Sequence, residues 1–454
     1  MSRRRLPLIL AVLLFAACDG QPDDGRAGAD AGPATDAGVS ELDIDLFGVP
    51  GHEFRFIVSP EQAEAMQKGD GGGGEDMYQL GGGTFADDLV VTDVADGDTH
   101  SFGKVELTLI GESTFRPWER IPNLRVDMDE FQPGLRVGGV EHFRLNNGQV
   151  GGIYREAIAA RLWRALGYPA PRSGFAWGKA PNQWTEPVRV PYTLMEVYKP
   201  GWCEESMPGC RNMWEAPGDI YALPGQCQFD LCEESRLTEL ISVLFALPYG
   251  AGYTAATADW VDWDAYRSFQ CLSWISGTGD DYLHNTNNLV LVERDDGRFQ
   301  LLPYSIDISA GQAWYSDVKL MGNSHLARAC QWDPACWDAL LDRCDEMLDE
   351  YDDLDVVGTI VEPTIAEVAA AGMERPGDDY RAEELVSWYG ERADKLRDDP
   401  VWQWTPCQED LDCEDDPDGN TECQGICVAP GSSCFDIGCP EGFWCDEFGE
   451  CQPF

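Results

Sequence analysis

The chain has 454 residues, of which 81 are Asp or Glu and 32 are Lys or Arg, so its formal net charge is −49. Nucleic-acid binding needs clustered Lys and Arg side chains for the phosphates, so this charge excludes nucleic acid as an expected partner. Such an acidic surface keeps a protein soluble and attracts cations.

Residues 1–18 have the pattern of a lipoprotein signal peptide. Arg3–Arg5 form a basic start, an apolar stretch follows, and small residues precede Cys18. The apolar stretch is too short to span a membrane as a helix. The ending LFAAC resembles a bacterial lipobox, in which the cysteine is lipidated; the alternative is an ordinary signal peptide with a chance cysteine. We expect an exported, membrane-anchored lipoprotein of the bacterial cell envelope, held by a lipid on Cys18.

Composition divides the remainder into three parts. Residues 19–40 are rich in Gly, Ala, Asp and Pro, which predicts a flexible acidic linker. Residues 41–400 are long enough to bury a sizeable core, and Asp398–Pro400 marks the expected end of this body. Residues 401–454 carry two units of four cysteines and few aliphatic residues, which predicts a disulfide-rich module. Zinc is the competing interpretation, but this segment has no Cys-x2-Cys pair and no His.

The patterning of the body predicts an α+β fold. Alternating apolar and polar residues predict strands over Glu53–Ser59, Val105–Leu109, Asn123–Met128, Leu289–Glu293 and Arg298–Leu302. Apolar residues at helical spacing predict helices over Pro60–Lys68, Tyr154–Leu166, Glu234–Leu247, Trp260–Ile275, Ser324–Glu350, Pro363–Ala371 and Glu383–Arg397.

The cysteines of the body are expected to form disulfides. The chain holds 17 cysteines, and setting aside Cys18 leaves an even number, which suits an oxidising, exported compartment. The segment Glu186–Asp230 is rich in turn residues and predicts a surface insertion with two disulfides. Cys330 and Cys336 are spaced for a further local bridge. The four cysteines of the insertion are Cys203, Cys210, Cys227 and Cys232.

The stretch Gly279–Gly311 carries the groups that predict chemistry. An Asp-Asp-Gly turn at 295–297 lies between two strand-like runs and predicts a β-hairpin. Asp280 precedes Asn285 by five residues, the interval of the Asp and Asn in a protein-kinase catalytic loop, and Asp307 follows the hairpin as a second acid. This spacing alone is a weak motif, because Asp and Asn also gather in turns.

The order of landmarks from about Val105 to Trp402 resembles the CotH family of exported, spore-coat-type proteins with an atypical protein-kinase fold. LTLIGESTF resembles the family's L-K-G-N-S-S-F turn, and VGGVEHFRLNNG with REAIAARLWRALGYPAPR resembles its LNN and R-E-x-L-A elements. GDDYLHN resembles W-D-x-Y-x-H-N, and LLPYSID resembles I-P-W-D-L-D. The resemblance implies an atypical protein-kinase-like fold, followed here by the small disulfide-rich tail.

The resemblance implies transfer of phosphate from ATP, with Mg²⁺, to a hydroxyl of a cell-surface or envelope protein. Asp280 then lies beside the acceptor, and Asn285 and Asp307 bind the metal. His284 is expected to be a structural residue rather than a base.

Two positions depart from the family's pattern. Ile110 stands where the family has Lys, and Ser305 replaces the first Asp of W-D-L-D. We expect Arg120 or Arg125 to supply the missing cation at the nucleotide site, with Glu196 orienting it. The alternative function is that of a non-catalytic cell-envelope lipoprotein that binds proteins or calcium through the same oxygen-rich loop and the cysteine-rich tail.

Overall fold

The structure is a computed structural model that describes residues 42–68, 84–110, 121–148, 152–179, 189–216, 218–228, 232–286, 288–310 and 322–399, with four short strands between 422 and 453. All of these belong to one compact unit, Glu41–Phe454, which is distinct from Met1–Ser40. The predictions for Cys18, for residues 19–40 and for most of 401–454 therefore lie outside the described residues. No described helix combines the length and the hydrophobicity that crossing a membrane requires.

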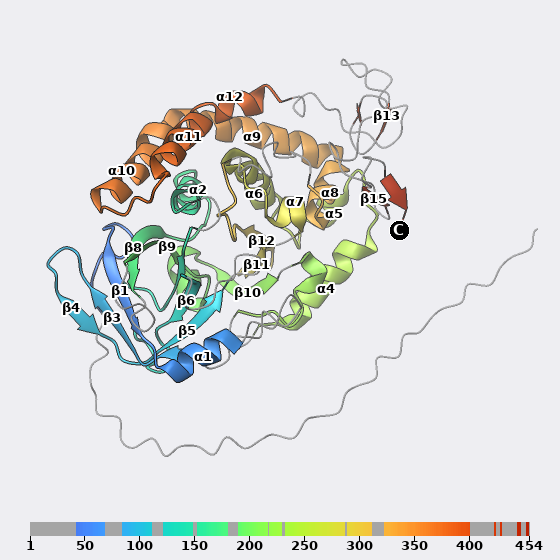
Figure 1. Ribbon diagram of the computed structural model, residues 1–454. Coiled ribbons are helices and arrows are strands. Elements are labelled where there is room, and N and C mark those ends of the chain that lie inside the picture. The colour runs from blue at the N-terminus through green and yellow to red at the C-terminus, as the bar shows by residue number, and fades with distance from the viewer. Residues whose placement is uncertain are drawn as a thin grey trace, which may run out of the picture. The chain divides into compact units, whose positions relative to one another are not determined.

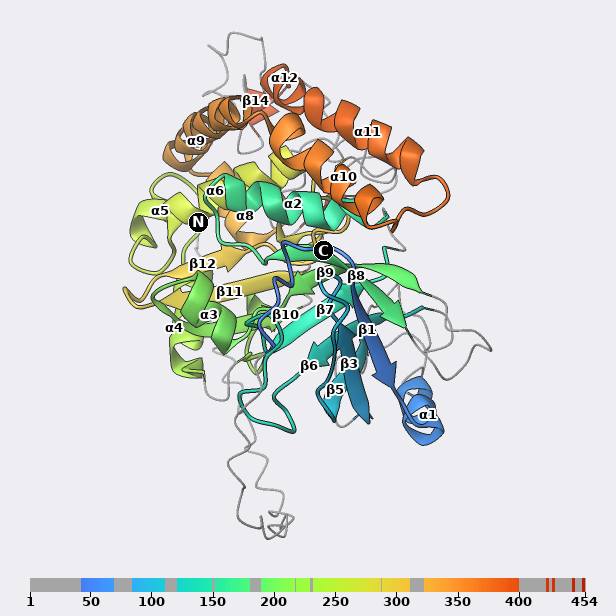
Figure 2. The same ribbon diagram turned by 90° about the vertical axis from the view of Figure 1, so that its left-hand side faces the viewer.

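The unit is mixed α+β, as predicted, and contains a large curled sheet of nine strands (Figures 1 and 2). Neighbouring strands follow the order β2-β5-β6-β7-β9-β8-β1-β3-β4. All neighbouring pairs are antiparallel except β1 and β8, which run parallel. The strands are β1 His52–Ile57, β2 Phe85–Ala86, β3 Asp88–Thr92, β4 Thr99–Ser101, β5 Val105–Ile110, β6 Asn123–Asp127, β7 His142–Asn146, β8 Ser173–Lys179 and β9 Val190–Glu196.

Alternation along the strands separates a core face from a polar face. Leu107, Val126 and Phe143 are register partners on β5, β6 and β7, and all three are fully buried in one hydrophobic cluster. Burying each such side chain contributes about 1.5–3 kcal/mol. The neighbouring positions point to the other face, so Arg125 and Arg144, which are also register partners, lie together there.

A second sheet contains the predicted hairpin. Its three strands are β10 Cys210–Ala216, β11 Leu289–Arg294 and β12 Phe299–Leu302, all antiparallel. The Asp-Asp-Gly turn closes β11 on β12, and the backbone N–H of Arg298 donates to Oδ1 of Asp296 over 3.0 Å. In the tail, β13 Glu422–Cys423 pairs with β14 Cys427–Val428, and β15 Phe443–Cys445 pairs with β16 Cys451–Pro453.

Helices form the other side of the unit, and α2 lies between the large sheet and the C-terminal helices (Figures 1 and 2). It contacts β8 and β9 on one side and α6 and α10 on the other. The helices are α1 Pro60–Lys68, α2 Tyr154–Ala165, α3 Pro200–Ser206, α4 Glu234–Ala246, α5 Tyr253–Ala256, α6 Trp263–Ser276, α7 Tyr282–Asn285, α8 His325–Gln331, α9 Pro334–Leu354, α10 Glu362–Ala370, α11 Asp378–Gly390 and α12 Arg392–Arg397.

Several predicted boundaries were wrong. The helix expected over Ser324–Glu350 is two helices, because Pro334 begins α9 and lacks the N–H that a continuous helix would need. The helix expected over Glu383–Arg397 is divided at Glu391 between α11 and α12. The segment Glu186–Asp230 is not mainly a surface insertion, because it contains the fully buried strand β9 and strand β10.

The disulfides expected in the body are present. The bridges are Cys203–Cys210, Cys227–Cys232 and Cys330–Cys336. Cys271 on α6 and Cys344 on α9 are buried free thiols, so the expectation of pairing does not hold for these two. Burial, and then the neighbouring Cys271, raises the pKa of the Cys344 thiol, which keeps it protonated and unreactive.

Candidate functional site

A buried ion pair joins the large sheet to α2. Arg144 on β7 pairs through Nη2 with Oε1 of Glu156, which lies in the first turn of α2. Asn146, two residues along β7, donates from Nδ2 to the other oxygen of Glu156 over 2.9 Å. The Arg144 and Glu156 side chains are 12% and 2% exposed. The pair therefore fixes α2 relative to the polar face of the sheet.

Asp307 lies beside this ion pair, five residues after the end of β12. Burial, and then the charge of Glu156, raises the pKa of Asp307 to about 7, although Arg144 acts in the opposite direction. Ser305 donates from Oγ to Oδ1 of Asp307 over 3.1 Å, so the serine that departs from the family's pattern contacts the remaining acid. The groups of the protein around Asp307 therefore do not fully stabilise its ionised form.

The raised pKa of Asp307 gives a pH dependence with a defined sign. Between its ordinary pKa near 4 and the folded value of about 7, the folded protein holds a proton that the unfolded chain has lost, so the unfolding free energy falls as pH rises. Without divalent metals, wild type is expected to lose stability relative to Asp307→Asn from about pH 4 to about pH 8. Urea unfolding of both proteins across this range measures the difference in unfolding free energy. If wild type became more stable relative to Asp307→Asn as pH rises, the raised pKa of Asp307 would be contradicted.

Backbone hydrogen bonds join the segments that carry Asp280 and Asp307. The N–H of Gly279 donates to the carbonyl of Ile308 over 3.1 Å, and the N–H of Ala310 donates to the carbonyl of Ser276 over 2.9 Å. The residues that precede Asp280 and follow Asp307 are thus bonded directly. The segments that carry these two acids, 27 positions apart in sequence, therefore lie side by side.

The neighbouring acid Asp281 has a structural role. It is buried, caps α7 by accepting the backbone N–H of His284 over 3.0 Å, and bonds the Nδ1 atom of the same His284 over 2.8 Å. Ser273 on α6 donates to its second oxygen. Asp281 and His284 therefore hold the loop in place, whereas Asp280 is only partly buried.

The backbone around the site adopts an unusual conformation. Thr286, Asn288, Ser305 and Ala310 have φ angles of 53°, 54°, 53° and 53°, in the left-handed region that costs non-glycine residues free energy. Such residues persist where surrounding contacts hold them, and they gather at functional sites. The four flank Asp280 and Asp307 along the chain.

Arg155 holds the segment that follows Asp307. From α2 its Nη1 donates to the carbonyls of Ser309 and Ala310 over 2.7 and 2.6 Å, and its side chain is 5% exposed. The helix that carries Glu156 thus also fixes the backbone beside Asp307.

Arg155→Met is expected to lower the unfolding free energy by about 2–4 kcal/mol, because two buried carbonyls lose a charged donor. The matched control is Arg164→Met on the exposed side of the same helix, whose guanidinium donates to one carbonyl, that of Ala170, over 2.9 Å, with an expected loss of about 1 kcal/mol. Urea unfolding measures both variants, and equal losses would show that Arg155 does not have this role.

Two further basic residues lie near Arg144, one on the sheet and one in the segment after β9. Arg125 is the register partner of Arg144, whose guanidinium lies 5.2 Å from the ring centroid of Tyr304. Burial, and then Arg125, lowers the pKa of Lys199, which places Lys199 in the same positive region. Arg125 therefore lies beside Arg144 on the polar face of the sheet, and Lys199 lies near Arg125.

The structure contradicts the role predicted for Glu196 and does not describe the side chains of Arg120 and Asn285. Glu196 does not orient Arg125: it pairs with Arg172 over 2.7 Å, and it shares the face of its register partner Phe143, opposite to Arg125. Arg120 lies outside the described residues, as does the side chain of Asn285, whose backbone belongs to α7.

Sequence reasoning missed Arg144, Glu156 and Lys199. Arg144 and Glu156 lie within the two segments whose resemblance to the CotH family was noted, FRLNNG and REAIAARL. A search for a charged residue on the strand and an acid in the first turn of the following helix would have identified the pair.

Fold and site together define a mixed α+β protein with an Arg-Glu-Asp centre between a sheet and a helix. No protein-family description and no curated protein sequence matches this chain.

Proposed function

We propose that the chain is an exported, membrane-anchored, CotH-like atypical protein kinase that transfers phosphate from ATP to a hydroxyl of a cell-envelope protein. The single observation that carries this proposal is the buried Arg144–Glu156 pair beside Asp307. Protein kinases require a strand cation paired with a helix glutamate, together with an acid that binds Mg²⁺. The resemblance of the surrounding sequence motifs supports the same function.

The residues of the site fit a divalent cation and a nucleotide. Asp307 is an oxygen donor whose pKa is raised by burial and then by the charge of Glu156, and Mg²⁺ prefers such oxygen donors. When bound, Mg²⁺ would supply charge neutralisation at the phosphates. Arg144, Arg125 and Lys199 would bind phosphate oxygens, and an arginine can do so with two parallel hydrogen bonds.

Asp280 is the proposed base for the acceptor hydroxyl. Its carboxylate would orient that hydroxyl and accept its proton during transfer. Asp307 would hold the metal beside it, since the two acids lie on hydrogen-bonded segments. The protein otherwise contributes position and charge, which is what phosphate transfer chiefly requires.

The test is transfer of labelled phosphate from ATP with Mg²⁺ by the purified mature chain, to itself and to envelope proteins. We expect Mg²⁺-dependent labelling that is lost in Asp307→Asn. Calcium binding without any response to ATP would instead favour the non-catalytic lipoprotein that binds calcium or proteins.

A further inference from the structure

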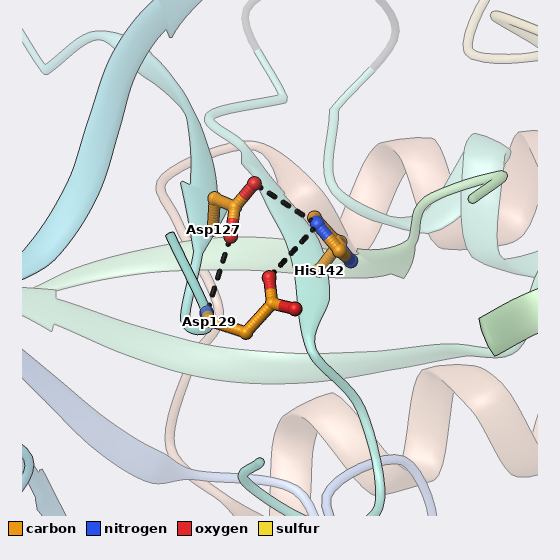
Figure 3. Close-up of side chains that lie close together, drawn as sticks. All are labelled: Asp127, Asp129 and His142. Carbon is orange, nitrogen blue, oxygen red and sulfur yellow. Dashed lines mark hydrogen bonds and ion pairs between the residues drawn. The ribbon is translucent and has the colours of Figure 1, made fainter. Parts of the chain in front are cut away.

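A cluster of two aspartates and a histidine lies on the polar face of the large sheet, at the ends of β6 and β7 (Figure 3). Asp127 is the last residue of β6, and His142, the first of β7, is its register partner. Asp129 follows two residues after Asp127. We call these three residues the Asp-Asp-His cluster.

One ring nitrogen of the histidine faces both carboxylates. Nε2 of His142 lies 2.9 Å from Oδ2 of Asp127 and 3.4 Å from Oδ1 of Asp129. The three ligand atoms all lie within 4.8 Å of one another. Because Nε2 carries at most one proton, it can donate a hydrogen bond to only one of these carboxylates at a time.

The local backbone holds this geometry before any ligand binds. The N–H groups of Asp129 and Glu130 donate to Oδ1 of Asp127 over 3.2 and 3.1 Å, which leaves Oδ2 directed at His142. The N–H of Met128 donates to the carbonyl of Glu141 over 2.8 Å, so the turn after β6 is tied to the start of β7.

The cluster is rich in negative charge, although Lys199 lies near enough to act on Asp127, and Lys199 and Arg125 both act on Glu106. Across the described residues, neither Asp127 nor Asp129 forms an ion pair with a Lys or Arg. Carboxylates of Glu106 and Glu130 also lie close enough to Asp127 to share an ion with it. A divalent cation would satisfy both aspartates at once, which a single imidazole proton does not.

We propose that the Asp-Asp-His cluster binds one divalent transition-metal ion, of which Zn²⁺ is the representative, through Nε2 of His142 and one oxygen each of Asp127 and Asp129. Imidazole nitrogen with carboxylate oxygens suits Zn²⁺ better than Mg²⁺ or Ca²⁺, which prefer oxygen ligands alone. Three protein ligands leave a fourth position for water.

The bound ion would tie the ends of two strands whose next outward-facing residues are Arg125 and Arg144. Zn²⁺ binding would therefore stabilise the sheet that presents these cations. The proposal is independent of kinase activity, because no residue of the cluster is one of the acids assigned to the nucleotide site.

The test is calorimetric titration of ZnCl₂ into the full mature chain after removal of metals, at physiological salt with excess Mg²⁺ and Ca²⁺. We expect one Zn²⁺ per chain, with X-ray absorption showing N and O ligands at about 2.0–2.2 Å. Asp129→Asn and His142→Gln are each expected to weaken binding at least about tenfold.

Matched controls separate this site from the acidic surface and from Asp307. His100→Gln, a histidine of strand β4, and Asp307→Asn are both expected to keep the wild-type affinity for Zn²⁺. Asp129 lies in a partly exposed turn, so Asp129→Asn is expected to keep the fold. This variant therefore tests the site even if His142→Gln does not fold. Several weak sites displaced by Ca²⁺, or unchanged affinity in folded Asp129→Asn, would overturn the proposal.

Discussion

Asp280→Asn is expected to lower the rate of phosphate transfer by about 10²–10⁴-fold while ATP binding is retained, since the amide cannot accept the hydroxyl proton. The substitution preserves size, and the backbone carbonyl of Asp280, which accepts from Nδ2 of Asn288 over 2.6 Å, is unchanged. The measurement is the initial rate of label transfer at saturating ATP, with ATP binding measured separately by calorimetry.

The matched control for this prediction is Asp264→Asn on α6. The Asp264 side chain is 87% exposed and pairs only with Arg267 among the described residues, so its loss is expected to leave the rate within about twofold. If Asp280→Asn transfers phosphate at the wild-type rate, then Asp280 is not the base, whatever the fold.

The second large effect is on stability. Glu156→Gln is expected to lower the unfolding free energy by about 3–5 kcal/mol, because it leaves the Arg144 guanidinium buried without its counter-charge. Burial alone would lower the pKa of Arg144, and Glu156 is the first neighbour that raises it, so the pair is the main compensation for this charge. The same change removes a negative charge beside Asp307 and is expected to lower the pKa of that carboxyl.

Urea unfolding of Glu156→Gln, Arg144→Met and the double variant measures this coupling. The loss of stability in the double variant is expected to be smaller than the sum of the two single losses, because neither member of the pair is left buried without its partner. Glu391→Gln, which breaks an exposed pair with Lys395, is the control and is expected to leave the unfolding free energy close to that of wild type. Additive losses in the double variant would show that Arg144 and Glu156 are not energetically coupled.

The sequence correctly predicted elements whose pattern depends on residues close together in the chain. The apolar stripe of α2 and the Asp-Gly turn between β11 and β12 were correctly predicted, because both depend on residues a few positions apart. Strand β9 was missed because all of its residues are buried, so the alternation that identifies a half-buried strand is absent. The start of α6 was placed three residues early, since Asp262, which caps it by accepting from Ala265 N–H, was read as helical.

The sequence likewise identified some residues of the candidate site and missed others. Asp280 and Asp307 were identified from spacing and resemblance; the backbones of the neighbouring Gly279 and Ile308 are hydrogen-bonded, and the roles of the two acids stay a prediction. The Arg144–Glu156 pair depends on how α2 packs against β7, which no local pattern encodes. The partner of Glu196 likewise depends on which sheet face it occupies, and this requires the register of β7 with β9.

The most direct test of the central claim is calorimetric titration of ATP into the mature chain in the presence and absence of Mg²⁺. We predict saturable binding of one ATP per chain that requires Mg²⁺ and is lost in Asp307→Asn, while Asp280→Asn binds like wild type. Absence of ATP binding by the folded wild-type protein with Mg²⁺ would contradict the assignment of this site to a kinase.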